Sequence, residues 1–124
     1  MKLQPDRSDA QTISAYGPGW VGVAGEKIAH SVVLGSGGER LPWATSFDAL
    51  VAADFEVIAR MNVEVVIFGS GARLRFPKPA WIAPLATARI GIETMDTPAA
   101  CRTYNILAME GRAVAVALLL EQPS

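Results

Sequence analysis

The sequence has few of the side chains that bind transition metals or act as nucleophiles. Among 124 residues there is one cysteine, Cys101, and one histidine, His30. A single cysteine cannot close an intramolecular disulfide, and these two residues alone cannot supply the ligands of a structural zinc cluster. Proteins without disulfides are usual in reducing compartments, so we expect a cytoplasmic protein without a structural metal.

An excess of positive charge and a long apolar run are also missing. Eleven Lys and Arg residues oppose twelve Asp and Glu residues. Nucleic-acid-binding domains usually carry a basic face, so we expect no nucleic-acid partner. The longest apolar run, 113–120, is far shorter than the roughly 18–20 residues that span a bilayer. Residues 1–10 have no apolar core for export and contain two Asp, which argues against a mitochondrial presequence. We therefore expect no membrane span.

Apolar residues are abundant. They make up 51% of the chain, and the mean hydropathy is +0.28. These values predict a well-filled core or a sizeable apolar contact surface. The length fits one domain. We expect a loose N-terminal arm at residues 1–10 and a single α/β domain at residues 11–124.

Hydrophobic periodicity alternates between the strand and the helix pattern. One helical segment contains Leu50, Phe55 and Ile58 and ends at 60–62. The strands are expected at 12–16, 20–23, 27–34, 63–68, 90–93 and 113–120, and the other helices at about 80–88 and from 96 or 97 to 110. The strands at 63–68 and 90–93 enclose a helix, which predicts a parallel β-α-β unit. The pattern does not fix the direction of the last strand.

Two loops of this β-α-β unit form the first candidate site. Ligands of open α/β sheets bind beyond the carboxyl ends of parallel strands. Glycines, nearby guanidinium groups and a helix start together suit an anion or another partner. The candidate residues are Gly69, Ser70, Gly71, Arg73, Asp96, Thr97, Arg102 and Asn105. In the alternative interpretation the glycines end a buried strand, Asp96 caps a helix, and Arg73 neutralises Asp96 or Glu93.

The final helix is amphipathic and carries the cysteine. Ala100, Tyr104, Leu107 and Ala108 share one face, and Arg102 and Asn105 are expected opposite. Cys101 lies near the helix start, where the helix dipole lowers a thiol pKa. No base is placed beside it, and His30 beside Ser31 lacks the G-x-S-x-G motif of a serine hydrolase. We therefore predict no catalytic residues.

A second candidate site is an interface in the segment 73–81. It interleaves basic, aromatic and proline residues, and it must leave the sheet. Arg and Trp are typical anchors of protein interfaces, so we single out Arg75, Phe76 and Trp81. Alternatively, Phe76 and Trp81 cover the sheet.

Three segments together resemble a known family. They are 16–19 (Tyr-Gly-Pro-Gly), 65–77 (from Val-Val-Ile-Phe-Gly-Ser-Gly to Pro) and 91–112 (Gly-Ile-Glu-Thr-Met-Asp-Thr-Pro to Gly-Arg). The sequence resembles the small α/β family that includes mitochondrial respiratory complex I assembly factor three. The resemblance implies three layers around a central mixed β-sheet with helices on its faces, no cofactor and no established catalytic residues. It marks Gly69, Gly71, Arg73, Asp96, Thr97, Arg102, Asn105 and Arg112 in this chain.

Two functional hypotheses follow. The first is a non-enzymatic binding or assembly protein, for which the resemblance implies partners such as respiratory-complex subunits or membrane-associated assembly proteins. The second is an enzyme or sensor that binds a small anionic ligand in a strand-end pocket at Gly69–Gly71 and Asp96–Thr97.

Overall fold

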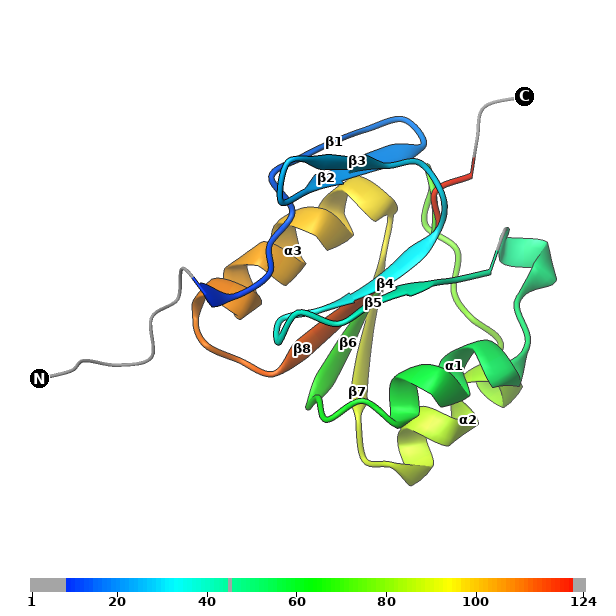
Figure 1. Ribbon diagram of the computed structural model, residues 1–124. Coiled ribbons are helices and arrows are strands. Elements are labelled where there is room, and N and C mark those ends of the chain that lie inside the picture. Colours follow the sequence, from blue (N-terminus) through cyan, green and yellow to red (C-terminus); the bar gives the residue numbers. More distant parts are fainter. Residues whose placement is uncertain (1–8, 45, 122–124) are drawn as a thin grey trace, which may run out of the picture.

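The computed structural model describes residues 9–44 and 46–121 (Figure 1). Most of the N-terminal arm expected at residues 1–10 therefore lies outside the described residues. A small sheet contains β1 (Ala15–Gly17), β2 (Trp20–Val23) and β3 (Glu26–Ile28), and the main sheet contains β4 (Val32–Gly35), β5 (Arg40–Pro42), β6 (Val65–Gly69), β7 (Gly91–Met95) and β8 (Val114–Leu118). The helices are α1 (Ala52–Ala59), α2 (Pro79–Thr87) and α3 (Thr97–Met109), and a 3-10 turn covers Phe47–Ala49.

The main sheet is mixed, with the strand order β5-β4-β8-β6-β7. β6 pairs in parallel with β7 on one side and with β8 on the other. β4 pairs antiparallel with both β5 and β8. The expected parallel β-α-β unit is confirmed as β6-α2-β7. The direction of the last strand, which the sequence left open, is parallel to β6 and antiparallel to β4.

The helices cover both faces of this sheet. Alternate residues of β8 point to opposite faces, as in any strand. Val114, Val116 and Leu118 pack in a core with α3 and the small sheet, and Ala115, Ala117 and Leu119 pack in a second core with α1 and α2. Figure 1 shows α3 on one side of the sheet and α1 and α2 on the other. The three-layer α/β fold is confirmed.

One expectation about the strands is wrong, and one strand was not expected. The strand expected at 27–34 is broken, because the chain leaves the small sheet after Ile28 and enters the main sheet at Val32. Between them, the Ser31 hydroxyl accepts a hydrogen bond from the Leu120 amide at 2.9 Å, and the Ser31 carbonyl accepts one from the Trp43 amide at 3.0 Å. β5 was not expected, because it is a short, exposed edge strand with little apolar patterning.

The chain ahead of β1 is attached to α3. The Asn105 amide group donates to the Ile13 carbonyl and accepts from the Ile13 amide, both at 2.8 Å. The Tyr104 hydroxyl donates to the Gln11 carbonyl at 2.5 Å. Asn105 therefore faces the same N-terminal segment as Tyr104, and its expected position opposite the Tyr104 face is wrong. A helical wheel cannot show this, because the contact joins segments over ninety residues apart.

Candidate functional site

The two loops after β6 and β7 meet at one edge of the sheet, as the sequence predicts. The Gly71 amide donates to Thr97 Oγ1 at 2.9 Å, and the Thr97 amide donates back to the Gly71 carbonyl at 2.8 Å. Thr97 Oγ1 also donates to the Leu119 carbonyl, at 3.0 Å, so one buried hydroxyl joins both loops to the chain after β8. The Ser70 amide adds a bond to the Met95 carbonyl at 2.9 Å.

Both glycines of this edge have packing or conformational reasons to be glycine. A Cβ atom at Gly69 would lie only 3.0 Å from the Ala100 Cβ and 3.1 Å from Thr97 Oγ1, because α3 approaches the β6 backbone closely. Gly71 has φ +107°, which side chains rarely adopt. The G-x-G spacing is therefore explained without a ligand.

The start of α3 uses its own backbone donors internally. The Asp96 carboxylate caps the helix by accepting from the Ala99 amide at 2.9 Å, and the Asp96 carbonyl accepts from the Ala100 amide. The Thr97 amide is bonded to Gly71, and Pro98 has no amide hydrogen. The predicted helix cap at Asp96 is confirmed. None of these first-turn amides is left for an anion.

Arg75, and not Arg73, holds the glycine loop. Its Nε and Nη2 atoms donate to the Ser70 carbonyl at 3.0 and 2.6 Å, and Nη2 forms a 2.6 Å salt bridge with Glu121. The second Glu121 oxygen accepts from the Phe47 amide at 2.9 Å. The expected neutralisation of Asp96 or Glu93 by Arg73 is not found: within the described chain, Arg73 makes no salt bridge and its side chain is exposed.

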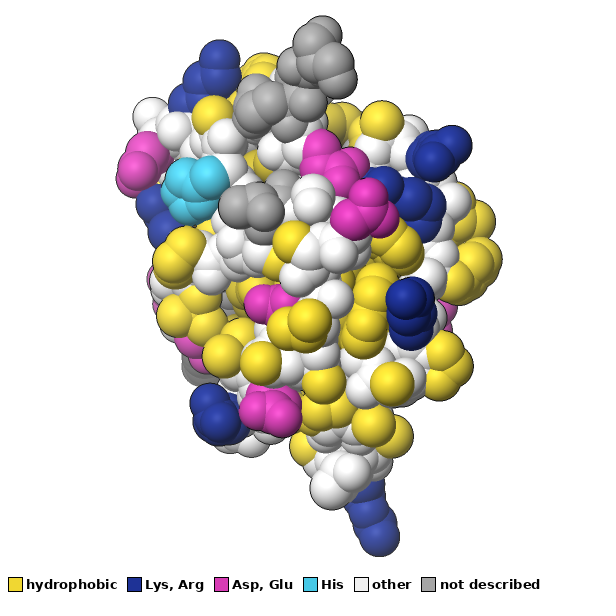
Figure 2. Space-filling view, turned by 90° about the vertical axis from the view of Figure 1, so that its right-hand side faces the viewer, with side chains coloured by type: hydrophobic (Ala, Val, Ile, Leu, Met, Phe, Trp, Pro, Cys, Tyr) yellow, Lys and Arg dark blue, Asp and Glu magenta, His cyan; other side chains and the backbone are white. Residues whose placement is uncertain are grey.

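The segment predicted as an interface divides into inward and outward side chains. The Arg75 guanidinium lies 4.6 Å from the centre of the Phe47 ring, which contacts the Trp81 ring edge-on at 5.3 Å. Arg75 and Trp81 therefore hold the segment onto the domain. Phe76 points outward and is 69% exposed. On the face shown in Figure 2, hydrophobic side chains lie next to Lys and Arg side chains.

The other candidate residues bond to partners outside the two loops. Arg102 is exposed and donates to the Tyr16 hydroxyl at 2.9 Å. Arg112, marked by the family resemblance, forms a 2.8 Å salt bridge with Glu64, which holds the pKa of that carboxyl below its usual value. Asn105 is occupied by the Ile13 backbone. The structure thus brings together Gly69–Gly71 and Asp96–Thr97 but does not join all eight candidates in one site.

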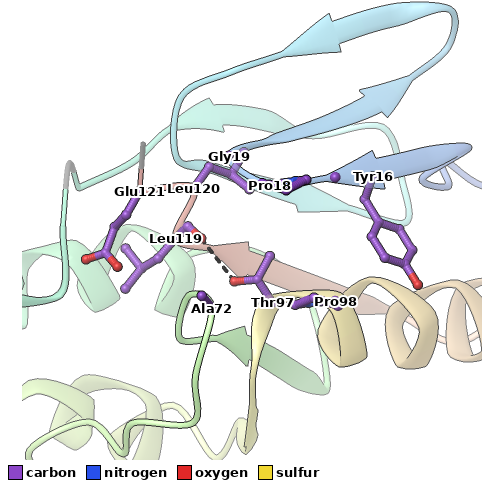
Figure 3. Close-up of a pocket in the computed structure, with 10 residues that line it drawn as sticks. Tyr16, Pro18, Gly19, Ala72, Thr97, Pro98, Leu119, Leu120 and Glu121 are labelled. Carbon is purple, nitrogen blue, oxygen red and sulfur yellow. Dashed lines mark hydrogen bonds between the residues drawn. The ribbon is translucent and has the colours of Figure 1, made fainter. Parts of the chain in front are cut away.

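A pocket of about 510 Å³ adjoins the same edge, and of the residues predicted for a strand-end pocket only Thr97 is among its walls. It lies between the β1–β2 turn, the start of α3 and the chain after β8 (Figure 3). Its walls are Tyr16, Gly17, Pro18, Gly19, Ala72, Thr97, Pro98, Leu119, Leu120 and Glu121. The Gly-Pro-Gly turn could have indicated a wall, but nothing in the sequence shows which segments face it.

The two residues considered as a nucleophile and its base, Cys101 and His30, lie in different environments. His30 is exposed, and its Nδ1 lies 3.0 Å from the Ser31 carbonyl oxygen. Cys101, on the inner face of α3, is fully buried in the core, and burial raises its thiol pKa to about 12. In the described part of the chain, no group of three or more His, Cys, Asp and Glu residues is arranged to hold a metal ion.

The burial of Cys101 gives a prediction about labelling and alkaline stability. Because the thiol pKa is raised from 9.0 to about 12, the unfolded chain loses this proton first as the pH rises. Its contribution to stability is complete below about pH 9 and is lost between there and about pH 12. We expect slow iodoacetamide labelling at neutral pH that becomes fast in guanidinium chloride. Equally fast labelling in both conditions would show that the thiol is accessible in the native protein.

Comparison with known proteins gives one matching family model. The model described as "Protein of unknown function (DUF498/DUF598)" matches residues 13–119. An uncharacterised protein of Rhodobacter capsulatus is 33% identical over 116 residues, which cover 94% of this chain and 90% of that protein. The NADH dehydrogenase [ubiquinone] 1 alpha subcomplex assembly factor 3 of Bos taurus is 37% identical over 58 residues, 47% of this chain and 32% of that protein.

A solved structure agrees with the fold. The crystal structure of a Bordetella parapertussis protein has a TM-score of 0.83 and 35% identity, and covers 90% of this chain and 97% of its own. In the described residues, no helix is both long and apolar enough to cross a membrane.

Proposed function

Because this chain belongs to the family of unknown function DUF498/DUF598 and is related to an NADH dehydrogenase assembly factor, we propose that it is a non-enzymatic binding or assembly protein. We place its action in the cytoplasm, where its free and buried cysteine would stay reduced. The proposal on binding depends on one observation, the exposed apolar side chains of the segment between β6 and α2.

This segment exposes its apolar side chains and turns its arginine inward. Arg75 is held against Ser70, Glu121 and Phe47, whereas its neighbours Leu74 and Phe76 are 52% and 69% exposed. Leu74 and Phe76 are exposed and Arg75 between them is half-buried, so the two apolar side chains lie on the outer side of the segment. Exposed large apolar side chains held in place by a rigid support are typical of binding surfaces.

The backbone of this segment can also take part in binding. Within the described chain, neither the amides nor the carbonyls of Leu74 and Phe76 form a hydrogen bond. An extended segment with unpaired backbone groups can accept a strand from a partner. The exposed Arg73 and Lys78 flank the apolar pair, so a partner with an apolar patch and acidic surroundings would fit.

The family relation supports a protein partner of a particular kind. The bovine relative is named as an assembly factor of NADH dehydrogenase. By analogy, a respiratory-complex subunit or a membrane-associated assembly protein is the partner that we propose. The analogy extends over about half of this chain and a third of the relative.

Replacing both outward side chains tests the proposal. We expect the double variant Leu74→Ser/Phe76→Ser to keep its stability, because both side chains are exposed, but to recover at least about tenfold less partner in a pulldown from the native host. The matched control is Ile106→Ser, which changes another exposed apolar residue, on α3. Equal partner recovery by the double variant and the wild type would exclude this surface.

Anion binding at Gly69–Gly71 and Asp96–Thr97 stays a prediction with less support. The amides of Gly71, Thr97 and Ala99 are already bonded within the chain. Arg73, two residues after Gly71, makes no salt bridge among the described residues and is the cation that could still pair with an anion. A thermal-shift series with phosphate, sulfate and small carboxylates tests this alternative, and no stabilisation at high concentrations would leave it without support.

A further inference from the structure

The pocket beside the loops after β6 and β7 has mostly apolar walls, which favour the binding of a hydrocarbon chain. Its polar side chains are already paired: Thr97 Oγ1 bonds Gly71 and Leu119, and both Glu121 oxygens are bonded, one to Arg75 and one to Phe47. Most of the other walls are glycine, alanine, proline and leucine. Figure 3 shows Pro18 and Gly19 on one side, and Thr97 and Pro98 on the other. Its volume of about 510 Å³ lies within the range of small-molecule sites.

The charged side chains at the two ends of the pocket differ in whether they have a partner of opposite charge. At one end the Glu121 carboxylate is neutralised by Arg75 in a 2.6 Å salt bridge. At the other end the wall residue Tyr16 accepts a hydrogen bond through its hydroxyl from Arg102, which stands behind it outside the walls and forms no salt bridge in the described part of the chain. The hydrogen bond to Tyr16, and after it the charge of Asp96, raise the pKa of Arg102, and Asp96 Oδ1 also accepts from the Ala99 amide. A guanidinium has five N–H donors, so Arg102 keeps donors for a ligand.

We propose that this pocket binds the hydrocarbon tail of a single-chain anionic amphiphile, such as a fatty carboxylate, with the anionic head at Arg102. The tail replaces water along the walls of proline, leucine and alanine, which gain from apolar contact. The head stays at the rim, where Arg102 supplies charge-assisted hydrogen bonds. The site does not involve Leu74 or Phe76, so it can fail or hold independently of the proposed protein-binding surface.

Chain length gives the first measurement. Octanoate, decanoate and dodecanoate are titrated below their micelle concentrations, with binding followed by amide chemical shifts. Each buried methylene should tighten binding about fourfold, so each step of two methylenes should tighten it about fifteenfold until the pocket is full. The saturating shifts should gather at Tyr16, Ala72 and Leu120. Shifts that gather at Leu74 and Phe76, affinities that ignore chain length, or no binding by any of the three would overturn the proposal.

Two variants test the tail and the head separately. Ala72→Trp fills the pocket from an exposed wall position and should abolish binding, whereas Ala53→Trp, on the exposed side of α1, should leave it unchanged. Arg102→Gln should weaken decanoate about tenfold and leave decanol unaffected. Decanoate binding that survives Ala72→Trp would place the tail elsewhere. Equal loss of decanoate and decanol in Arg102→Gln would exclude the head-group contact.

Discussion

Phe55→Ala is expected to lower the free energy of unfolding by about 3–5 kcal/mol, the usual cost of removing a buried aromatic side chain. Phe55 is fully buried between α1 and the sheet. Its ring meets Trp43 edge-on at 5.4 Å and Phe68 at 5.8 Å, and Trp43 and Phe68 also meet at 5.9 Å. The substitution leaves a cavity and removes two aromatic contacts at once, which close packing cannot repair.

The matched control is the same chemical change at an exposed position. Phe76→Ala should alter the free energy of unfolding by less than about 0.5 kcal/mol, because Phe76 is already largely in water. Urea unfolding followed by circular dichroism measures both variants. If the two substitutions cost the same, either the core around Phe55 collapses without loss or Phe76 packs against the domain.

Thr97→Val is the second large effect and should lower the free energy of unfolding by about 2–6 kcal/mol, because it leaves two buried polar groups unpaired. The two side chains have nearly the same shape, so the change removes the hydroxyl and little else. It leaves the Gly71 amide and the Leu119 carbonyl, which the hydroxyl now joins, without this partner. Each buried polar group left unpaired costs about 1–3 kcal/mol.

Thr97→Ser provides the control, because it keeps the hydroxyl and removes one methyl group. We expect it to cost about 1 kcal/mol. The same urea experiment compares the two variants. A valine variant as stable as the serine variant would mean that water or a shifted loop replaces both bonds. In that case the Thr97 hydroxyl would not be needed for stability and could bond a ligand instead.

The elements that the sequence predicts well are those decided by local patterns. The strands around Phe68 and Val116 are apolar on both faces and are buried on both faces. Asp96 followed by Pro98 marks the start of α3 through rules that involve only neighbouring residues. The meeting of the loops after β6 and β7 follows from their parallel pairing. Local chemistry thus determines most of the β-α-β unit.

The elements that the sequence misses are those decided by distant partners. The break after Ile28 depends on Ser31, which bonds Leu120 and Trp43. β5 exists because the exposed strand at Arg40–Pro42 returns alongside β4. Neither the break after Ile28 nor β5 produces a periodic pattern of apolar residues in the sequence, because each depends on which strand lies beside β4.

The candidate site shows the same limit. The sequence places Arg73 and Arg75 equally near the glycine loop, and only the position of Glu121 decides which one pairs. The pocket walls come from the β1–β2 turn, the residue after Gly71, the start of α3 and the end of the main sheet. Its members share no motif, so their common site follows from the fold and cannot be found from spacing.

The central place of β8 has a consequence for how the protein is made in the cell. β4 and β6 are joined in the sheet only through β8, which lies between them, and Val32 of β4 pairs with Leu118 of β8. At roughly 5–20 residues per second, a ribosome needs on the order of ten seconds to add the chain between these two residues. Until β8 is made, the edges of β4 and β6 that face it have no strand to pair with. The nascent chain therefore exposes unpaired backbone hydrogen-bonding groups along these edges. Chaperone binding to ribosome-bound chains should therefore be strongest after β6 has emerged and should fall once β8 has followed.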